Sequence, residues 1–92
     1  MTAVSETVEI VNERGLHARA SAKFVGLVAE KFENLEVTVA RDGAEAAGGS
    51  ILGLMMLGAA KGDSIEIRVK GDGAKEALAS LAELVRTGFG EG

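Results

Sequence analysis

Ile-Glu-Ile-Arg-Val at residues 65–69 decides the fold, because apolar and charged side chains alternate along it without a break. Successive side chains of a β-strand point to opposite faces, so this pattern predicts a strand with one buried and one wet face. Residues 35–39, Leu-Glu-Val-Thr-Val, alternate in the same way, and residues 7–11, Thr-Val-Glu-Ile-Val, do so less regularly. An Asp-Gly turn at residues 42–43 predicts that residues 44–47 return as a short, weak fourth strand.

Two helical patterns lie between the expected strands. In each, apolar residues recur at intervals of three or four, as on the buried stripe of a helix that packs on a sheet. The first pattern comprises Ala20, Phe24, Leu27, Val28 and Phe32, and the second comprises Ala74, Ala77, Leu78, Leu81 and Val85.

The order of these segments indicates the architecture. Strands with one wet face can be covered only on the other face, so the helices are expected to share one side of the sheet. The predicted fold is α/β (α+β), an open-faced β-sandwich with a four-stranded, mainly antiparallel sheet and three helices on one face, in the order βαββαβα. A parallel, doubly wound sheet would need strands that are apolar on both faces, and these strands are not.

Length and composition bound the remaining possibilities. The 92 residues are expected to form a single domain, 1–92, whose Gly-rich stretch 88–92 is frayed. The chain has no cysteine and one histidine, which excludes disulfides, thiol nucleophiles and His-rich or thiolate metal sites, and we expect neither metal nor cofactor.

Charge and hydropathy exclude further classes of function. A net charge of −4, with three Phe and no Tyr or Trp, disfavours nucleic-acid binding, because neither a basic stripe nor a stacking surface is present. The first residues lack the basic and apolar regions of a signal peptide, and no apolar run is long enough to span a bilayer. We therefore expect a cytoplasmic protein without membrane insertion.

The only histidine, His17, stands within Gly-Leu-His-Ala-Arg at residues 15–19, where a polar turn gives way to the first helical pattern. Its imidazole is expected at a helix N-terminus, where backbone N–H groups lack partners and the helix dipole is positive. Residues 14–29 include Arg14, Arg19 and Lys23 and no acidic residue. A titratable nucleophile in such surroundings suits an anion, most simply phosphate.

Two interpretations of His17 remain on residues alone. It is either a capping or surface residue, or part of a small module that handles an anion or accepts a phosphoryl group. The coincidence of His17, Arg19 and the acid-free stretch favours the second. A Ser-His-Asp set, a pair of catalytic carboxylates and a Walker loop are all missing from the sequence, which argues against an autonomous enzyme.

Residues 46–60 carry no charge and many large apolar side chains. Ser50 is a good N-cap for a short helix in this segment. The buried stripe of that helix could be filled by Ile51 and Leu54, with Met55 between the buried and the exposed face. Leu52 and Met56 would then point elsewhere, so the segment is either core that the rest of the chain covers, or a surface that faces water or a partner.

Together, residues 15–19 and the later motif Ser-Ile-Leu-Gly-Leu-Met at residues 50–55 resemble the HPr family, the histidine-containing phosphocarriers of the phosphoenolpyruvate-dependent sugar phosphotransferase system. The resemblance extends over nearly the whole chain in length, element order and motif spacing. It implies that His17 accepts a phosphoryl group on Nδ1 from enzyme I and passes it to an enzyme IIA. Arg19 would steady the phosphoryl oxygens during this transfer.

The same resemblance implies a regulatory site and a docking surface. Ser50 matches a serine that an HPr kinase/phosphorylase phosphorylates in some bacteria. The helix after it matches the family's docking surface, so Leu52 and Met55 are expected to be at least partly exposed. Because the family works by transient docking, we expect a monomer. The expected partner-binding residues are Ala20, Ser21, Lys23, Ile51, Leu52, Met55 and Met56.

One departure and two alternatives complete the hypothesis. The family commonly has proline after the arginine, whereas Ala20 keeps its N–H donor and loosens the turn slightly, which predicts a modest effect on phosphohistidine lifetime. The His17 chemistry could instead serve a nitrogen-related regulatory phosphotransferase branch. Alternatively, the chain could be an allosteric docking module controlled by phosphorylation of Ser50.

Overall fold

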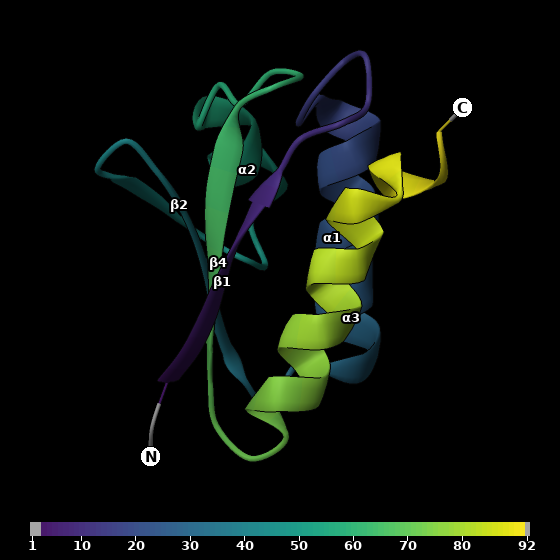
Figure 1. Cartoon of the computed structure of the whole chain (residues 1–92). Helices are drawn as coiled ribbons and strands as arrows, with labels where there is room; N and C mark the ends of the chain where they lie inside the picture. The colour runs from purple at the N-terminus through teal and green to yellow at the C-terminus, as the bar shows by residue number, and fades with distance from the viewer. Residues whose placement is uncertain (1–2, 92) are drawn as a thin grey trace.

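The computed structural model describes residues 3–91 and contains the predicted elements in the predicted order (Figure 1). The strands are β1 (Ala3–Glu9), β2 (Glu36–Arg41), β3 (Ala44–Ala47) and β4 (Ser64–Lys70). The helices are α1 (Ala18–Lys31), α2 (Ile51–Met56) and α3 (Ala74–Arg86), followed by a short 3₁₀ turn, η1 (Gly88–Gly90).

The four strands form one sheet in the order β1-β4-β2-β3, and each of the three pairings between these described strands is antiparallel. Val37 lies opposite Val69 and Val39 opposite Ile67, and all four side chains are buried. The residues between them on β4 and β2 point to the other face, which is polar. The strict alternation at residues 65–69 therefore has the cause that the sequence predicted, a sheet with one covered face.

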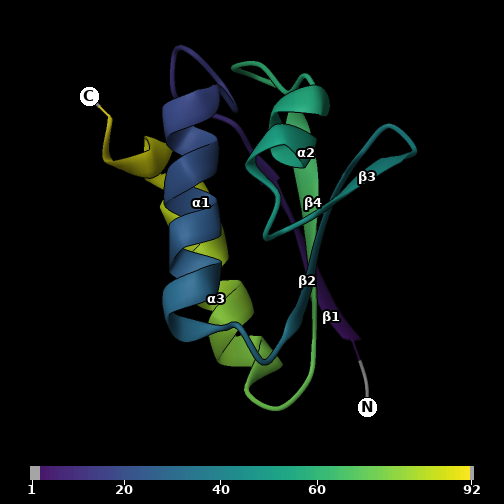
Figure 2. The same cartoon turned by 180° about the vertical axis from the view of Figure 1, so that it is seen from behind.

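The helices cover a single face of this sheet, which confirms the open-faced sandwich. α1 and α3 run beside each other along the sheet, and α2 lies next to the beginning of α1 (Figures 1 and 2). One hydrophobic cluster contains Phe24 from α1, Leu54 from α2 and Leu81 from α3, packed with Ile67 of the sheet. Each of these four side chains is at most 1% exposed.

Two expectations differ from the structure. The first strand was expected at residues 7–11 but is Ala3–Glu9; after Ile10 the chain turns away from the sheet and Val11 is 43% exposed. The stretch 88–91 is not frayed: η1 forms a turn and the Phe89 side chain is 1% exposed. Burial of an aromatic ring in the core outweighs the flexibility of the surrounding glycines. Gly92, the last residue of the expected tail, lies outside the described residues.

Within residues 3–91, no helix combines the length and the hydropathy that crossing a membrane would require.

Candidate functional site

His17 occupies the N-cap position of α1, which confirms its expected place at a helix N-terminus. Its backbone is extended, with φ −78° and ψ −178°, and its Nδ1 accepts a hydrogen bond from the backbone N–H of Arg19 at 3.3 Å. The first turn, residues 18–20, contains no acidic side chain. The imidazole nitrogen Nδ1 therefore faces the positive end of the helix dipole.

The loop before His17 is fixed by close contact with the segment that follows α2. The Leu16 N–H donates to the Ala59 carbonyl at 3.0 Å, and the Leu16 side chain is buried. Gly15 has φ +63°, and a Cβ there would lie 2.4 Å from the Ala59 carbonyl oxygen. Only glycine fits this approach, which accounts for the residue that begins the Gly-Leu-His motif.

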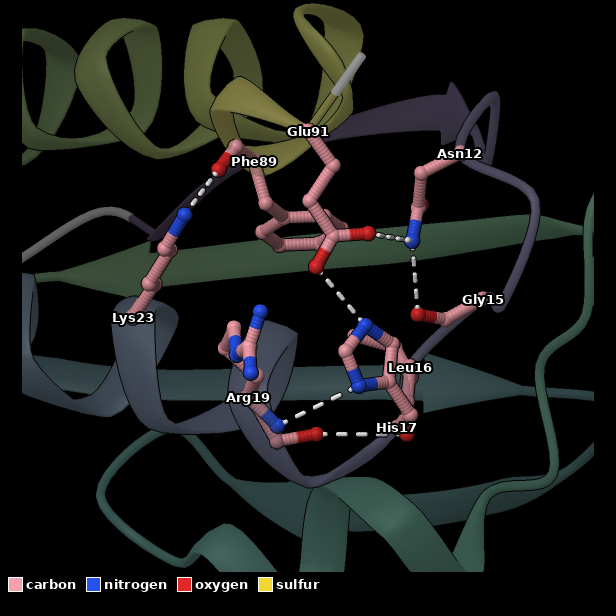
Figure 3. A network of polar contacts seen from close by, with 9 residues as sticks. Asn12, Gly15, Leu16, His17, Arg19, Lys23, Phe89 and Glu91 are labelled. Atoms are coloured by element: carbon pink, nitrogen blue, oxygen red, sulfur yellow. Dashed lines mark hydrogen bonds and ion pairs between the residues drawn. The ribbon is translucent and has the colours of Figure 1, made fainter.

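The other ring nitrogen of His17 contacts a residue that the sequence analysis missed. His17 Nε2 lies 2.8 Å from Oε2 of Glu91, 74 positions along the chain (Figure 3). Oε1 of the same carboxylate accepts a hydrogen bond from Nδ2 of Asn12 at 3.2 Å. Asn12 Nδ2 also donates to the Gly15 carbonyl at 2.9 Å. The phosphoryl-accepting candidate is thus held from both sides, by α1 and by the segment after α3.

These partners assign the tautomer of the neutral His17 ring. A carboxylate only accepts hydrogen bonds, so Nε2 must carry the proton that it shares with Glu91. Nδ1 accepts from the Arg19 N–H and must carry the lone pair. The nucleophilic nitrogen of the ring is therefore Nδ1, the atom that the resemblance predicts as the acceptor.

The charge of Glu91 is secured by its neighbours. Burial raises the pKa of the Glu91 carboxyl, but hydrogen bonds from His17 and Asn12, together with electrostatic attraction to His17 and Lys23, lower it. The resulting pKa lies below the usual range of a glutamate, so the carboxylate is ionised at neutral pH.

Two basic side chains of α1 have different surroundings. Lys23 donates from Nζ to the Phe89 carbonyl at 2.7 Å, which ties α1 to η1 (Figure 3). Arg19 is exposed, and its guanidinium makes no hydrogen bond or ion pair with any residue between 3 and 91. Arg19 is thus available to an anion that approaches Nδ1.

Ser50 caps α2 in the manner that the sequence predicted. Its Oγ accepts a hydrogen bond from the Gly53 N–H at 2.9 Å, and the residue is half-buried. A Cβ at Gly53 would lie 2.9 Å from that Oγ, so a larger residue there would require the Ser50 side chain to shift.

The apolar side chains of α2 divide between the core and the surface. Leu54 and, just after the helix, Leu57 are buried, whereas Ile51, expected on residues alone to help fill the buried stripe, is not. The exposed fractions are 41% for Ile51, 67% for Leu52, 39% for Met55 and 77% for Met56. The exposure expected for Leu52 and Met55 is confirmed, and α2 carries an exposed apolar surface of four side chains beside the beginning of α1.

Two residues expected on the partner surface are buried instead. Ala20 and Ser21 are both 0% exposed, because the third and fourth residues of α1 face the core. The Ser21 hydroxyl donates to the Leu16 carbonyl at 3.3 Å and so helps to hold the loop before His17. Their side chains are buried beneath the site and form no part of its exposed surface.

In the part of the chain that the structure describes, no group of three or more His, Cys, Asp or Glu side chains is placed to hold a metal ion.

Comparison with known proteins accords with this geometry. The family described as PTS HPr component phosphorylation site matches residues 4–87. This chain belongs to the HPr family. It is 45% identical over 89 residues to the phosphocarrier protein HPr of Neisseria meningitidis serogroup A, covering 97% of this chain and 98% of that protein. The crystal structure of HPr-C-His from Thermoanaerobacter tengcongensis matches with a TM-score of 0.86 at 35% identity, over 100% of this chain and 99% of that one.

A shorter match involves a second kind of phosphocarrier. The phosphocarrier protein NPr of Escherichia coli K12 is 43% identical over 60 residues, which is 64% of each chain. Taken with the matches over nearly the whole length, these findings establish an HPr-family phosphocarrier of the phosphotransferase system.

Proposed function

We propose that His17 is the residue that carries the phosphoryl group, that enzyme I donates this group and that an enzyme IIA receives it during sugar uptake. The observation that carries the proposal is the orientation of the ring: Nδ1 presents its lone pair at the first turn of α1, while Glu91 occupies Nε2. As the only histidine of the chain, His17 is also the only residue that could form phosphohistidine.

The site suits a group that must be held and then released. Phosphoryl oxygens on Nδ1 would meet the N–H groups of the first turn, residues 18–20, which have no intrahelical partners. Each such helix-end interaction stabilises an anion by about 0.3–1 kcal/mol, or up to about 2 kcal/mol in favourable geometry. Arg19 would add a charge-assisted hydrogen bond as charge shifts over the equatorial oxygens during in-line transfer.

The exposed apolar surface of α2 (Ile51, Leu52, Met55 and Met56) supports docking of both partners. It lies beside the beginning of α1, so a protein that reaches Nδ1 also covers α2 (Figure 2). Methionine side chains adapt to different surfaces, which a carrier with several partners requires. The cytoplasmic location and the monomeric state expected from the sequence belong to the same proposal.

Ser50 supports a regulatory extension. Its hydroxyl caps α2 immediately before the exposed apolar surface, so an HPr kinase/phosphorylase that modifies it would place about −1.5 to −2 charges at the edge of that surface. Such a charge would disfavour docking of an acidic partner.

The match to NPr favours one second candidate, the nitrogen-related regulatory branch. Both branches use the same His17 chemistry, so the receiving protein distinguishes them. Offering the phosphorylated chain separately to an enzyme IIA of each branch, and measuring the rate of transfer to each, decides between them. Faster transfer to the sugar-specific protein supports our first proposal, and the reverse supports the second.

The proposed role of His17 is tested by incubating the protein with enzyme I, Mg²⁺ and labelled phosphoenolpyruvate. We expect a label that is labile in acid, stable in alkali and absent from a folded His17→Ala variant. Absence of label, when an established HPr is labelled in the same mixture, would contradict the proposal. It would then favour an allosteric docking module controlled through Ser50, which the exposed surface of α2 would serve.

A further inference from the structure

We propose that Glu91, oriented by Asn12, is a positioning residue that fixes the His17 ring for phosphoryl transfer and neutralises the charge that the ring acquires. The inference rests on the proposed function of His17, and it assigns a role to two residues that lie outside the Gly-Leu-His-Ala-Arg motif.

The first support is the way in which the Glu91 carboxylate is used. Each of its oxygens has one partner: Oε2 faces His17 Nε2 at 2.8 Å and Oε1 faces Asn12 Nδ2 at 3.2 Å. The same Asn12 nitrogen donates to the Gly15 carbonyl at 2.9 Å, so it links the carboxylate to the loop that carries the histidine (Figure 3). The side chains of His17 and Glu91 are 16% and 20% exposed, which protects their contact from water.

The second support is an unfavourable feature of Asn12. The residue is 4% exposed, and its Oδ1 is buried without a hydrogen-bond partner among residues 3–91. Turning the amide over would place Oδ1 against two acceptors, the Gly15 carbonyl and Glu91 Oε1, so the observed orientation is the only one that serves both. A buried polar residue that leaves an acceptor unpaired next to a reactive group indicates a functional constraint.

The third support is the backbone that brings Glu91 to the ring. Gly88, Phe89 and Gly90 have φ values of +68°, +58° and +74°, three successive residues in the left-handed region. A bulky residue such as Phe89 rarely adopts this conformation, and such strain persists only where surrounding contacts impose it. Burial of the Phe89 ring and the hydrogen bond from Lys23 to its carbonyl supply those contacts. The chain thereby turns back over the N-terminus of α1.

The proposed phosphoryl transfer changes the charge of the His17 ring, and Glu91 is placed to respond to that change. The donor is a phosphohistidine whose other ring nitrogen is protonated; its N–P bond breaks and the electron pair returns to the donor ring, which becomes neutral. The lone pair of His17 Nδ1 forms the new N–P bond, while the proton on Nε2 stays in place. The His17 ring becomes positively charged opposite the Glu91 carboxylate, which stabilises that charge. With the ring turned over, the lone pair would face Glu91 and transfer could not begin.

The test compares Glu91→Ala and Glu91→Gln with Glu83→Gln, which removes the same charge from an exposed position of α3. Because a charge-assisted hydrogen bond is lost, we expect kcat for transfer from enzyme I to Glu91→Ala to fall about 10- to 100-fold, with KM changing less. Glu91→Gln keeps an acceptor but no charge and should lie between, while Glu83→Gln should match the wild type. Wild-type kcat in Glu91→Ala would overturn the inference.

A spectroscopic measurement needs no partner protein. In wild type, the Nε2 proton of His17 should exchange slowly and give a downfield proton signal correlated with that nitrogen. The Glu91→Ala variant should lose this signal. Absence of the signal from wild type would overturn the inference. Asn12→Asp keeps the shape of the side chain but turns its two donated hydrogen bonds into repulsion, so it should lose the signal too and slow transfer. Wild-type behaviour of Asn12→Asp would overturn the orienting role of Asn12.

Failure of this inference can be distinguished from failure of the proposed function. If the wild-type protein takes up no label, the proposed function fails. If the wild-type protein is labelled and Glu91→Ala is labelled equally fast, only this inference fails.

Discussion

Two helix N-termini within residues 3–91, at His17 and at Ser50, are capped by a side chain through the same kind of hydrogen bond but lie in different surroundings. In each, a side chain accepts a hydrogen bond from an unpaired N–H of the first turn: Arg19 N–H to His17 Nδ1 at 3.3 Å, and Gly53 N–H to Ser50 Oγ at 2.9 Å. Both atoms are candidate phosphorylation sites. The difference lies in what surrounds them.

The His17 cap has charged side chains around it, and its ring is also held on the side away from the helix. Arg19 and Lys23 lie on the same helix, and Glu91 contacts the far side of the ring. The Ser50 cap lies in the uncharged segment 46–60 and adjoins an exposed apolar surface. Under the proposed function, a helix end would make a phosphate tolerable at both places, whereas the neighbouring side chains would decide whether the phosphate is transferred onward or alters docking.

The largest effect should come from removing the exposed positive charge beside the first cap. Arg19→Ala should slow transfer about 100-fold, the usual cost of one transition-state hydrogen-bond donor. Its fold should be unchanged, because the side chain is exposed. Lys31→Ala removes a positive charge from the far end of the same helix and is the matched control. Single-turnover kinetics with phosphorylated enzyme I measure the effect, and equal rates for the two variants would show that Arg19 has no special role.

The next effect concerns the apolar surface beside the second cap. Leu52→Asp should weaken binding to enzyme I about 10-fold or more, since burying a leucine side chain contributes about 1.5–3 kcal/mol. Its thermal transition should be preserved, because Leu52 is 67% exposed. Leu54→Ala, from the buried side of the same helix, should instead lower the free energy of unfolding by about 2–5 kcal/mol. Calorimetry measures both quantities; a lost thermal transition in Leu52→Asp would place that residue in the core.

A smaller effect distinguishes the caps themselves. Ser50→Ala should lower the free energy of unfolding by about 0.5–2 kcal/mol, because the Gly53 N–H loses its acceptor. Ser50→Asp retains an acceptor and should stay closer to wild type, while its charge should weaken docking to an acidic partner. Denaturant titration compares the two variants. A Ser50→Ala variant as stable as wild type would mean that the cap contributes nothing.

The smallest effect concerns the first turn of α1. Ala20 makes no intrahelical hydrogen bond with its N–H, since the first such bond in the helix is from Ser21 N–H to the His17 carbonyl. Ala20→Pro should therefore be accommodated and raise the free energy of unfolding by about 0.4–1 kcal/mol, with a modest change in phosphohistidine lifetime. Thermal unfolding and the rate of spontaneous dephosphorylation test this. A large loss of stability would show that the Ala20 N–H has an essential partner.

Most of the fold could be predicted from local patterns. The alternation at residues 65–69 and the spacing from Ala74 to Val85 report burial directly, because one face of each element is covered and the other is wet. The end of β1 was misplaced because Val11 continues the apolar pattern although the chain leaves the sheet before this residue.

The candidate site could be predicted only where it is local in sequence. His17, Arg19 and Ser50 lie within short motifs, whereas Glu91 reaches His17 across 74 positions by a turn of three residues with positive φ. Its Gly-rich neighbourhood predicted fraying, and the signal against that prediction was Phe89, an aromatic residue that a frayed end would leave exposed. Ala20 and Ser21 were placed on the partner surface through the resemblance, although the spacing of the first helical pattern already counted Ala20 on the buried stripe.

The central claim is that the phosphoryl group resides on Nδ1 of His17, and nuclear magnetic resonance of the phosphorylated, ¹⁵N-labelled protein tests it most directly. The account predicts coupling between phosphorus and Nδ1, with the proton retained on Nε2 opposite Glu91. Coupling to Nε2 instead would contradict it, because that nitrogen faces the carboxylate and could accept a phosphoryl group only after the ring had turned away from both of its partners.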